Sequence, residues 1–164
     1  MKKVAIAYNK ILLTHDGSEL ASFALPHAIK LAQVFNAKII LVQVIDTMMQ
    51  VTAKLQPPHI NYGGVYATDD MEEVYENQKA EALENLAEVK NELATIGIQN
   101  IEIKIAEGSP GEEIVDLAKR QKCDLIITST RGRSGLGRAL LGSVADHVVR
   151  NAPCPVLLIH PQEE

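Results

Sequence analysis

Apolar runs rich in β-branched residues alternate along this chain with longer segments in which apolar residues recur every three or four positions. The runs have the length of strands, and the periodic segments have the length of amphipathic helices. Such alternation is typical of βα units that build a parallel sheet. The pattern therefore predicts an α/β domain, an open parallel sheet with helices on both faces.

Five strands are predicted from the apolar runs, over residues 10–14, 38–44, 101–106, 124–128 and 156–160. The second run is almost continuously apolar, as in strands that are covered on both faces. If the chain starts in the middle of the sheet, builds outward through strands two and three and then crosses back, the strand order becomes 3-2-1-4-5. This is a Rossmann-like arrangement.

Four periodic segments predict helices, over residues 18–35, 71–96, 111–120 and 143–151. Ser18 is placed to cap the first helix, and Ser109-Pro110 to begin the third. Pro26 lies inside the first segment. Because proline removes a backbone donor and clashes with the preceding turn, we expect a kink or a late start there.

The second helical segment, 71–96, has as candidates for its buried side Val74, Leu83, Leu86, Val89 and Leu93. Residues 46–70 come before it and contain two prolines and two adjacent glycines without a sustained period, so we predict a long loop there. No repeat or low-complexity tract marks a second domain. Residues 1–164 are therefore predicted to form a single domain.

Composition narrows the classes of function. With 46% hydrophobic residues, the 164-residue chain can bury a core, and a formal net charge of −5 argues against nucleic acid as a partner. No apolar stretch approaches the ~18 residues of a membrane helix, and no export signal is evident, so we expect a cytoplasmic protein without a membrane partner. The two cysteines lack the spacing of a zinc site.

Residues 129–143 form the segment richest in binding chemistry, with four glycines, three arginines and four hydroxyl side chains between a strand and a helix. Glycines let the backbone approach an anion closely, and the following helix adds its positive N-terminal end. The segment therefore predicts a phosphate site, although glycine loops also simply turn corners. A P-loop is disfavoured, because Ser143 stands where the phosphate-binding lysine belongs.

Asp16 follows the first predicted strand. In the order 3-2-1-4-5 the loops after strands one and four converge at the carboxyl edge of the sheet, which brings Asp16 opposite the glycine-rich segment. A carboxylate there suits a ribose hydroxyl, an adenine amino group or a magnesium ion. A turn or cap role is equally open for Asp16. A binding or proton-transfer role is open for His15 beside a packing role.

Three stretches together resemble the universal stress proteins: Asp16-Gly17-Ser18, Gly132-x9-Gly142-Ser143, and Ala152-Pro-Cys-Pro-Val-Leu near the end. The ATP-binding branch of that family carries the pattern G-x2-G-x9-G-[S/T]. Gly132, Gly142 and Ser143 match its last three defined positions, while Ser129 replaces the first glycine. The resemblance implies ATP or AMP as the ligand, with or without Mg²⁺.

The resemblance also implies which residues bind. Asp16 and Val44 would contact adenosine, and Thr14 and Thr128 would line its pocket. Ribose and phosphates would be held by Ser129, Thr130, Arg131, Gly132, Gly142, Ser143 and Val144.

A further implication is a homodimer formed through Val156, Leu157, Leu158 and Ile159 in the last predicted strand. The function that fits best is a dimeric nucleotide-binding module or sensor of the stress response. Two alternatives remain open, a slow ATPase or nucleotide transferase on the same fold, and a dimeric scaffold that binds no nucleotide.

Overall fold

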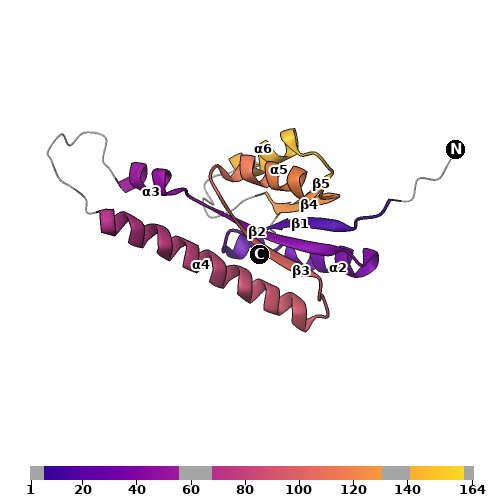
Figure 1. Cartoon of the computed structure of the whole chain (residues 1–164). Helices are drawn as coiled ribbons and strands as arrows, with labels where there is room; N and C mark the ends of the chain where they lie inside the picture. The colour runs from indigo at the N-terminus through magenta and orange to yellow at the C-terminus, as the bar shows by residue number, and fades with distance from the viewer. Residues whose placement is uncertain (1–5, 56–67, 131–140, 161–164) are drawn as a thin grey trace.

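The computed structural model of the chain describes residues 6–55, 68–130 and 141–160. Its five strands form one parallel sheet in the order β3-β2-β1-β4-β5, as predicted (Figure 1). The strands are β1 (Lys10–Thr14), β2 (Lys38–Ile45), β3 (Ile101–Glu107), β4 (Leu125–Ser129) and β5 (Val156–Ile159).

Six helices accompany the sheet in the described residues: α1 (Glu19–Ser22), α2 (Leu25–Phe35), α3 (Met48–Leu55), α4 (Thr68–Thr95), α5 (Pro110–Gln121) and α6 (Ser143–Asn151). Helices α2 and α4 cover one face of the sheet and α5 and α6 the other, which gives three layers (Figure 1). None of the helices described is long and apolar enough to cross a lipid bilayer.

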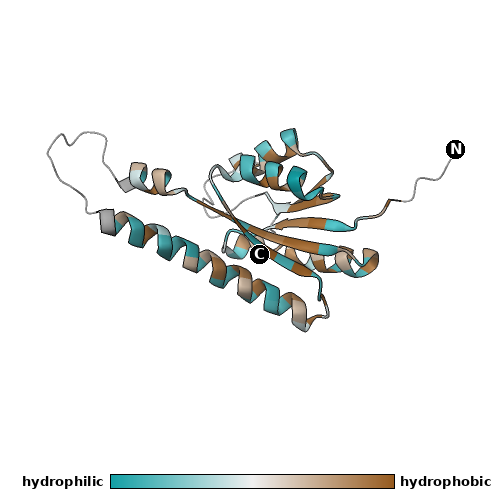
Figure 2. Ribbon diagram, in the orientation of Figure 1, coloured by the Kyte–Doolittle hydropathy of each residue, from teal (hydrophilic) through white to brown (hydrophobic). Residues whose placement is uncertain are grey.

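Each face of the sheet carries its own hydrophobic core because alternate side chains of a strand point to opposite faces. In β1, Ile11 and Leu13 pack against α2 and α4, while Leu12 packs against α5 and α6. Figure 2 shows the result as hydrophobic strands between helices that are hydrophilic on their outer sides. Burial on both faces explains why β2 is almost entirely apolar in sequence.

The first predicted helix is divided into α1 and α2. The second of these begins at Leu25, in agreement with the late start predicted from Pro26. Ser18 caps α1, its side chain accepting a hydrogen bond from the backbone N–H of Ala21. The chain then restarts as α2, with Pro26 in the first turn, where its missing N–H costs nothing.

The prediction of a loop throughout residues 46–70 is wrong for Met48–Leu55, which form α3. Thr47 and Gln50 make a reciprocal capping box: the Thr47 Oγ1 accepts from the Gln50 N–H at 3.2 Å, and the Gln50 Oε1 accepts from the Thr47 N–H at 2.8 Å. Val51 adds a buried anchor. The cap and this apolar contact begin a helix of eight residues.

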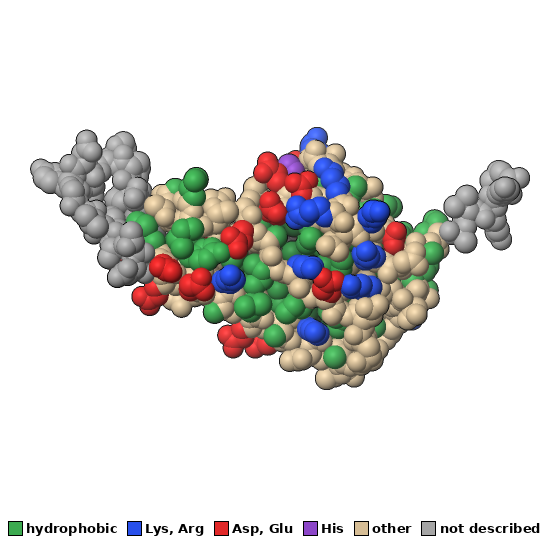
Figure 3. All heavy atoms as spheres, viewed as in Figure 1, with side chains coloured by type: hydrophobic (Ala, Val, Ile, Leu, Met, Phe, Trp, Pro, Cys, Tyr) green, Lys and Arg blue, Asp and Glu red, His purple; other side chains and the backbone are tan. Residues whose placement is uncertain are grey.

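Helix α4 buries a different stripe from the one predicted. Leu86, Val89 and Leu93 are buried as expected, but Leu83 is 45% and Val74 is 41% exposed. The buried stripe begins instead at Ala82, four residues before Leu86, so Leu83 lies beside it. The N-terminal half of α4, which carries Val74, extends beyond the sheet and lies beside α3, and hydrophobic side chains there are mixed with acidic ones (Figures 1 and 3).

Helices α5 and α6 approach closely at Gly111. Gly111 is buried, and a Cβ atom added to it would lie 2.8 Å from the Cβ of His147 on α6. A real Cβ does not approach another at this distance, so the absence of a side chain at residue 111 sets the spacing of the two helices.

Gly111→Ala should therefore destabilise the protein by about 1–3 kcal/mol, because the added methyl group must push α6 away from α5. Helix propensity alone predicts the opposite sign, a gain of about 1 kcal/mol. Urea unfolding of the variant measures the difference. The exposed neighbour Glu112→Ala is the control and should change the free energy of unfolding by only about half a kcal/mol or less. A stabilised Gly111→Ala variant would contradict the packing described.

Glu102 on the edge strand β3 gives the fold a dependence on pH. Hydrogen bonds from the ammonium groups of Lys104 and of Lys38, the latter at 2.5 Å, lower the pKa of Glu102 to about 2. A carboxylate whose pKa is lowered by folding stabilises the protein above its unfolded pKa, and this contribution is lost as the pH falls toward the folded pKa.

Glu102→Gln should therefore lower the free energy of unfolding at neutral pH, by less than about 1 kcal/mol because the pair is partly solvated. The difference between wild type and variant should shrink as the pH falls below about 4, where the unfolded carboxyl takes up its proton. Urea titrations at a series of pH values measure it. A difference that does not change with pH would show that the ionised carboxylate is not the stabilising group.

Candidate functional site

The carboxyl ends of β1, β2 and β4 open onto a cavity of about 460 Å³. It lies where the strand order reverses between β1 and β4, the position at which open α/β sheets bind their ligands. Nine predicted site residues line it: Thr14, Asp16, Val44, Thr128, Ser129, Thr130, Gly142, Ser143 and Val144. The other two, Arg131 and Gly132, lie outside the described residues.

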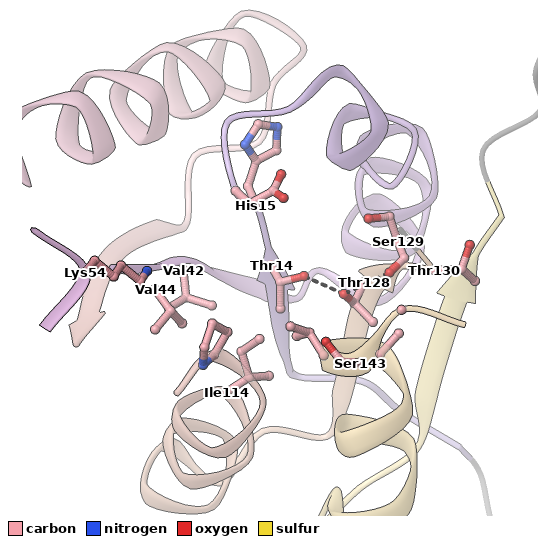
Figure 4. Close-up of a pocket in the computed structure, with 15 residues that line it drawn as sticks. Thr14, His15, Val42, Val44, Lys54, Ile114, Thr128, Ser129, Thr130 and Ser143 are labelled. Carbon is pink, nitrogen blue, oxygen red and sulfur yellow. Dashed lines mark hydrogen bonds between the residues drawn. The ribbon is translucent and has the colours of Figure 1, made fainter. Parts of the chain in front are cut away.

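The floor of the cavity is formed by the last residues of two neighbouring strands. The Thr14 hydroxyl of β1 donates to the Thr128 hydroxyl of β4 at 2.7 Å (Figure 4). Thr128 is buried, so this bond satisfies a hydroxyl that would otherwise be costly to keep from water. The bond holds the ends of β1 and β4 together directly beneath the cavity.

Asp16 holds a turn and also lines the cavity. Its Oδ1 accepts from the Ser18 backbone N–H at 3.0 Å and from the Ser18 hydroxyl at 2.6 Å. Gly17 between them has a φ of 82°, a left-handed conformation that favours glycine. This tight turn places Asp16 among the residues that line the cavity.

The N-terminus of α6 forms another wall. Its first three residues, Ser143, Val144 and Ala145, all line the cavity. Backbone N–H groups of a first helical turn have no acceptor within the helix, and Gly142 at the N-cap makes no side-chain cap. With the positive end of the helix dipole, these donors make a wall suited to an anion.

Gly142 is held where a side chain would crowd the backbone. Its N–H donates to the Thr130 carbonyl at 2.8 Å, and an added Cβ would lie 3.1 Å from that oxygen. Glycine thus lets the chain pass close to the end of β4 before α6 begins. The N-terminus of the helix is in this way fixed at the edge of the sheet.

The remaining wall is apolar. Val42 and Val44 of β2 lie opposite Ile114 of α5 (Figure 4). Pro110, at the start of α5, lines the same part of the cavity. A surface of this kind favours the flat face of a ring over a hydrated group. The cavity therefore combines an apolar end with a backbone wall suited to an anion.

His15 does not direct its ring toward the cavity (Figure 4). Its Nδ1 accepts from the Gly17 N–H at 3.1 Å, and its Nε2 lies 3.3 Å from the Ser22 hydroxyl. An accepting Nδ1 places the ring proton on Nε2 in the neutral imidazole. The ring holds the turn after β1, so the packing role is favoured over proton transfer to a ligand.

Lys54 of α3 was missed by the sequence interpretation, because its segment was assigned to a loop. It lines the cavity, and its Nζ lies 2.6 Å from the Asp46 Oδ2. The hydrogen bond from Lys54 lowers the pKa of Asp46, which also accepts from Gln78 of α4. The capping box at Thr47 and Gln50 was the signal that could have revealed this helix and its lysine.

Metal and thiol chemistry find no support in the part of the chain that is described. No group of three or more His, Cys, Asp or Glu side chains there could hold a metal ion. Burial raises the pKa of Cys123 to about 11 and also raises the pKa of Cys154, which disfavours the reactive thiolate in both.

Comparison with known proteins agrees with this geometry. The profile of the Universal stress protein family matches residues 7–160. Universal stress protein MJ0531 of Methanocaldococcus jannaschii is 37% identical over 158 residues, which cover 96% of this chain and 85% of that protein.

Solved structures share the fold. The structure of hypothetical protein MJ0577 superposes with a TM-score of 0.80 at 28% identity and covers 97% of this chain and 100% of its own. A universal stress protein solved in complex with cAMP has a TM-score of 0.63 at 25% identity and covers 94% of this chain and 98% of its own. The chain therefore belongs to the universal stress protein family.

Proposed function

We propose that this universal stress protein binds an adenine nucleotide, AMP or ATP, in the cavity at the carboxyl edge of its sheet. The observation that carries the proposal is the convergence of Asp16 and the first turn of α6 on one cavity that also has an apolar wall. These are the three kinds of surface that a nucleotide needs, for its ribose, its phosphates and its base. The cAMP complex of the relative at 25% identity supports this choice of ligand.

The proposed orientation follows from the chemistry of each wall. The base lies against Val42, Val44 and Ile114, and a ribose hydroxyl donates to the Asp16 carboxylate. The phosphates accept from the N–H groups that begin α6. The part of the cavity between the base and the phosphates is lined by Thr14, Thr128, Ser129 and Thr130.

Arg131 and Gly132 belong to the same proposal, as residues of the phosphate end. With ATP, a Mg²⁺ ion would be carried by the phosphates themselves. The volume of the cavity, about 460 Å³, falls within the range of about 300–1,000 Å³ that is usual for small ligands. A nucleotide fits this size, whereas a protein or nucleic-acid partner does not.

The proposed biological role is that of a cytoplasmic binding module or sensor of the stress response. Binding requires no catalytic group, and the one histidine beside Asp16 uses its ring to hold the turn. The protein would respond to whether its cavity holds a nucleotide.

Asp16→Asn should weaken the binding of AMP about tenfold, because a hydrogen bond to a charged acceptor becomes one to a neutral acceptor. The amide can still accept from Ser18, so the turn should persist. Isothermal titration calorimetry measures the dissociation constants. Asp70→Asn, which neutralises an exposed carboxylate on α4, is the matched control and should bind AMP as the wild type does.

If the wild-type protein takes up neither AMP nor ATP at millimolar concentration, the proposal fails and the scaffold alternative gains. Equal affinities of the Asp16→Asn variant and the wild type would leave nucleotide binding in place but remove Asp16 from the site.

We further propose that two copies pair through β5. In the part of the chain described, this edge strand pairs only with β4. The Pro155 carbonyl accepts from Ile126 of β4, and the Ile159 carbonyl accepts from Thr130, which follows β4. Because the backbone groups of a strand alternate in direction, Val156 and Leu158 between them direct their N–H and C=O groups outward. A short apolar edge with outward backbone groups is a template for a second strand.

Leu158→Lys should convert the dimer into a monomer, because it places a charge on the edge without removing a member of either core cluster. Sedimentation velocity measures the change. Val34→Lys, at an exposed position on α2, is the matched control and should remain dimeric. A wild-type protein that sediments as a monomer at all concentrations would refute the β5 interface.

A further inference from the structure

Thr130 lies between the cavity and the open edge of the sheet. It follows β4 directly, lines the cavity and is buried. On one side its N–H donates to the Ile159 carbonyl at 2.8 Å, and on the other its carbonyl accepts from the Gly142 N–H, also at 2.8 Å. A single peptide segment thus connects the end of β5 with the start of α6.

The Thr130 side chain adds a second connection to the edge. Its Oγ1 lies 3.1 Å from the Nδ1 of His160, the residue that follows β5. His160 is exposed and is not among the described residues that line the cavity, so Thr130 connects its ring to the binding site. The Thr130 backbone and side chain together bind two consecutive residues at the end of the edge strand.

The far side of this connection is the wall suited to an anion. Gly142, held by Thr130, is the N-cap of α6, and its carbonyl accepts from the Asp146 N–H at 2.9 Å to begin the helix. The position of Thr130 therefore sets the position of the N–H groups of Ser143 to Ala145 that line the cavity. A displacement of the end of β5 would be transmitted to these donors through two hydrogen bonds, from the Thr130 N–H to the Ile159 carbonyl and from the Gly142 N–H to the Thr130 carbonyl.

We propose that pairing of a second copy at β5 strengthens nucleotide binding in the cavity, with Thr130 and His160 as the positioning residues that connect the two sites. This inference rests on the proposed nucleotide binding and on the proposed β5 dimer. A partner strand restricts the motion of β5, so Thr130 and the first turn of α6 are already ordered when the nucleotide arrives, and less entropy is lost on binding. By thermodynamic linkage, each nucleotide bound strengthens the dimer by the same factor.

A double-mutant cycle on the full chain tests the connection. The four proteins are the wild type, Leu158→Lys, His160→Ala and the double variant, and the measurement is the dissociation constant for AMP at protein concentrations where the wild type is a dimer. In the background that keeps His160, Leu158→Lys should weaken AMP binding about fivefold or more, the lower end of typical coupling between sites. In the His160→Ala background the same change should have a smaller effect, because only the backbone hydrogen bond from Thr130 to Ile159 still connects the edge strand to the cavity.

Two further variants distinguish a positioning role of His160 from a general loss of structure. His160→Asn keeps a hydrogen-bonding group near Thr130 and should restore most of the dependence on Leu158, which a purely structural role for the imidazole would not predict. His27→Ala removes an exposed histidine on α2 and should bind AMP as the wild type does in both oligomeric states.

The outcomes distinguish this inference from the proposals on which it rests. Equal AMP affinities of the wild-type dimer and the Leu158→Lys monomer would overturn the coupling and leave nucleotide binding intact. An equal effect of Leu158→Lys with and without the His160→Ala change would overturn the route through His160. If Leu158→Lys stays dimeric, the β5 interface and the coupling fail together, and an absence of AMP binding by the wild type removes all three.

Discussion

The pairing of β4 with β1 is the constraint on which the candidate site depends. These strands are about 110 residues apart in sequence and lie side by side in parallel, with Ile11 opposite Leu125 and Leu13 opposite Ile127. At the start of the pair, the Asp124 carboxylate accepts from the N–H groups of Asn9 and Lys10 at 2.8 and 2.9 Å. The register set there carries the two strand ends, and the loops that follow them, to the same edge of the sheet.

Most of the groups that face the cavity are positioned by backbone geometry. The turn at Gly17 aims Asp16, the threonine pair joins β1 to β4, and Gly142 brings α6 close to Thr130. Backbone donors are held by the fold and need little reordering when an anion arrives, unlike long basic side chains. Such donors can therefore serve the phosphate end of the proposed site although the chain has a net charge of −5.

Helix α3 and Lys54 add an element that the regular βα pattern does not contain. Asp46, at the end of β2, binds both Lys54 of α3 and Gln78 of α4, which fastens the two helices to the sheet beside the cavity. Helix α3 is only eight residues long, and of its apolar residues Val51 is buried while Met49 is exposed. Its position is set by contacts with α4, which periodicity in the sequence does not record.

The sequence by itself determined the class of fold, the strand order and the two loops that meet at the site, because hydrophobic period, caps and glycines act locally and a right-handed parallel sheet allows few topologies. The tertiary structure alone decided that Leu83 is exposed beside a buried stripe, that the His15 ring turns away from the cavity, and that Thr130 bonds to both β5 and α6. The exposure of Leu83 and the bonds of Thr130 depend on contacts between residues distant in sequence, whereas the His15 ring is held by its near neighbours Gly17 and Ser22. The sequence pattern indicates the secondary structure that each segment prefers. Which segments then pack against one another is decided only in the tertiary structure.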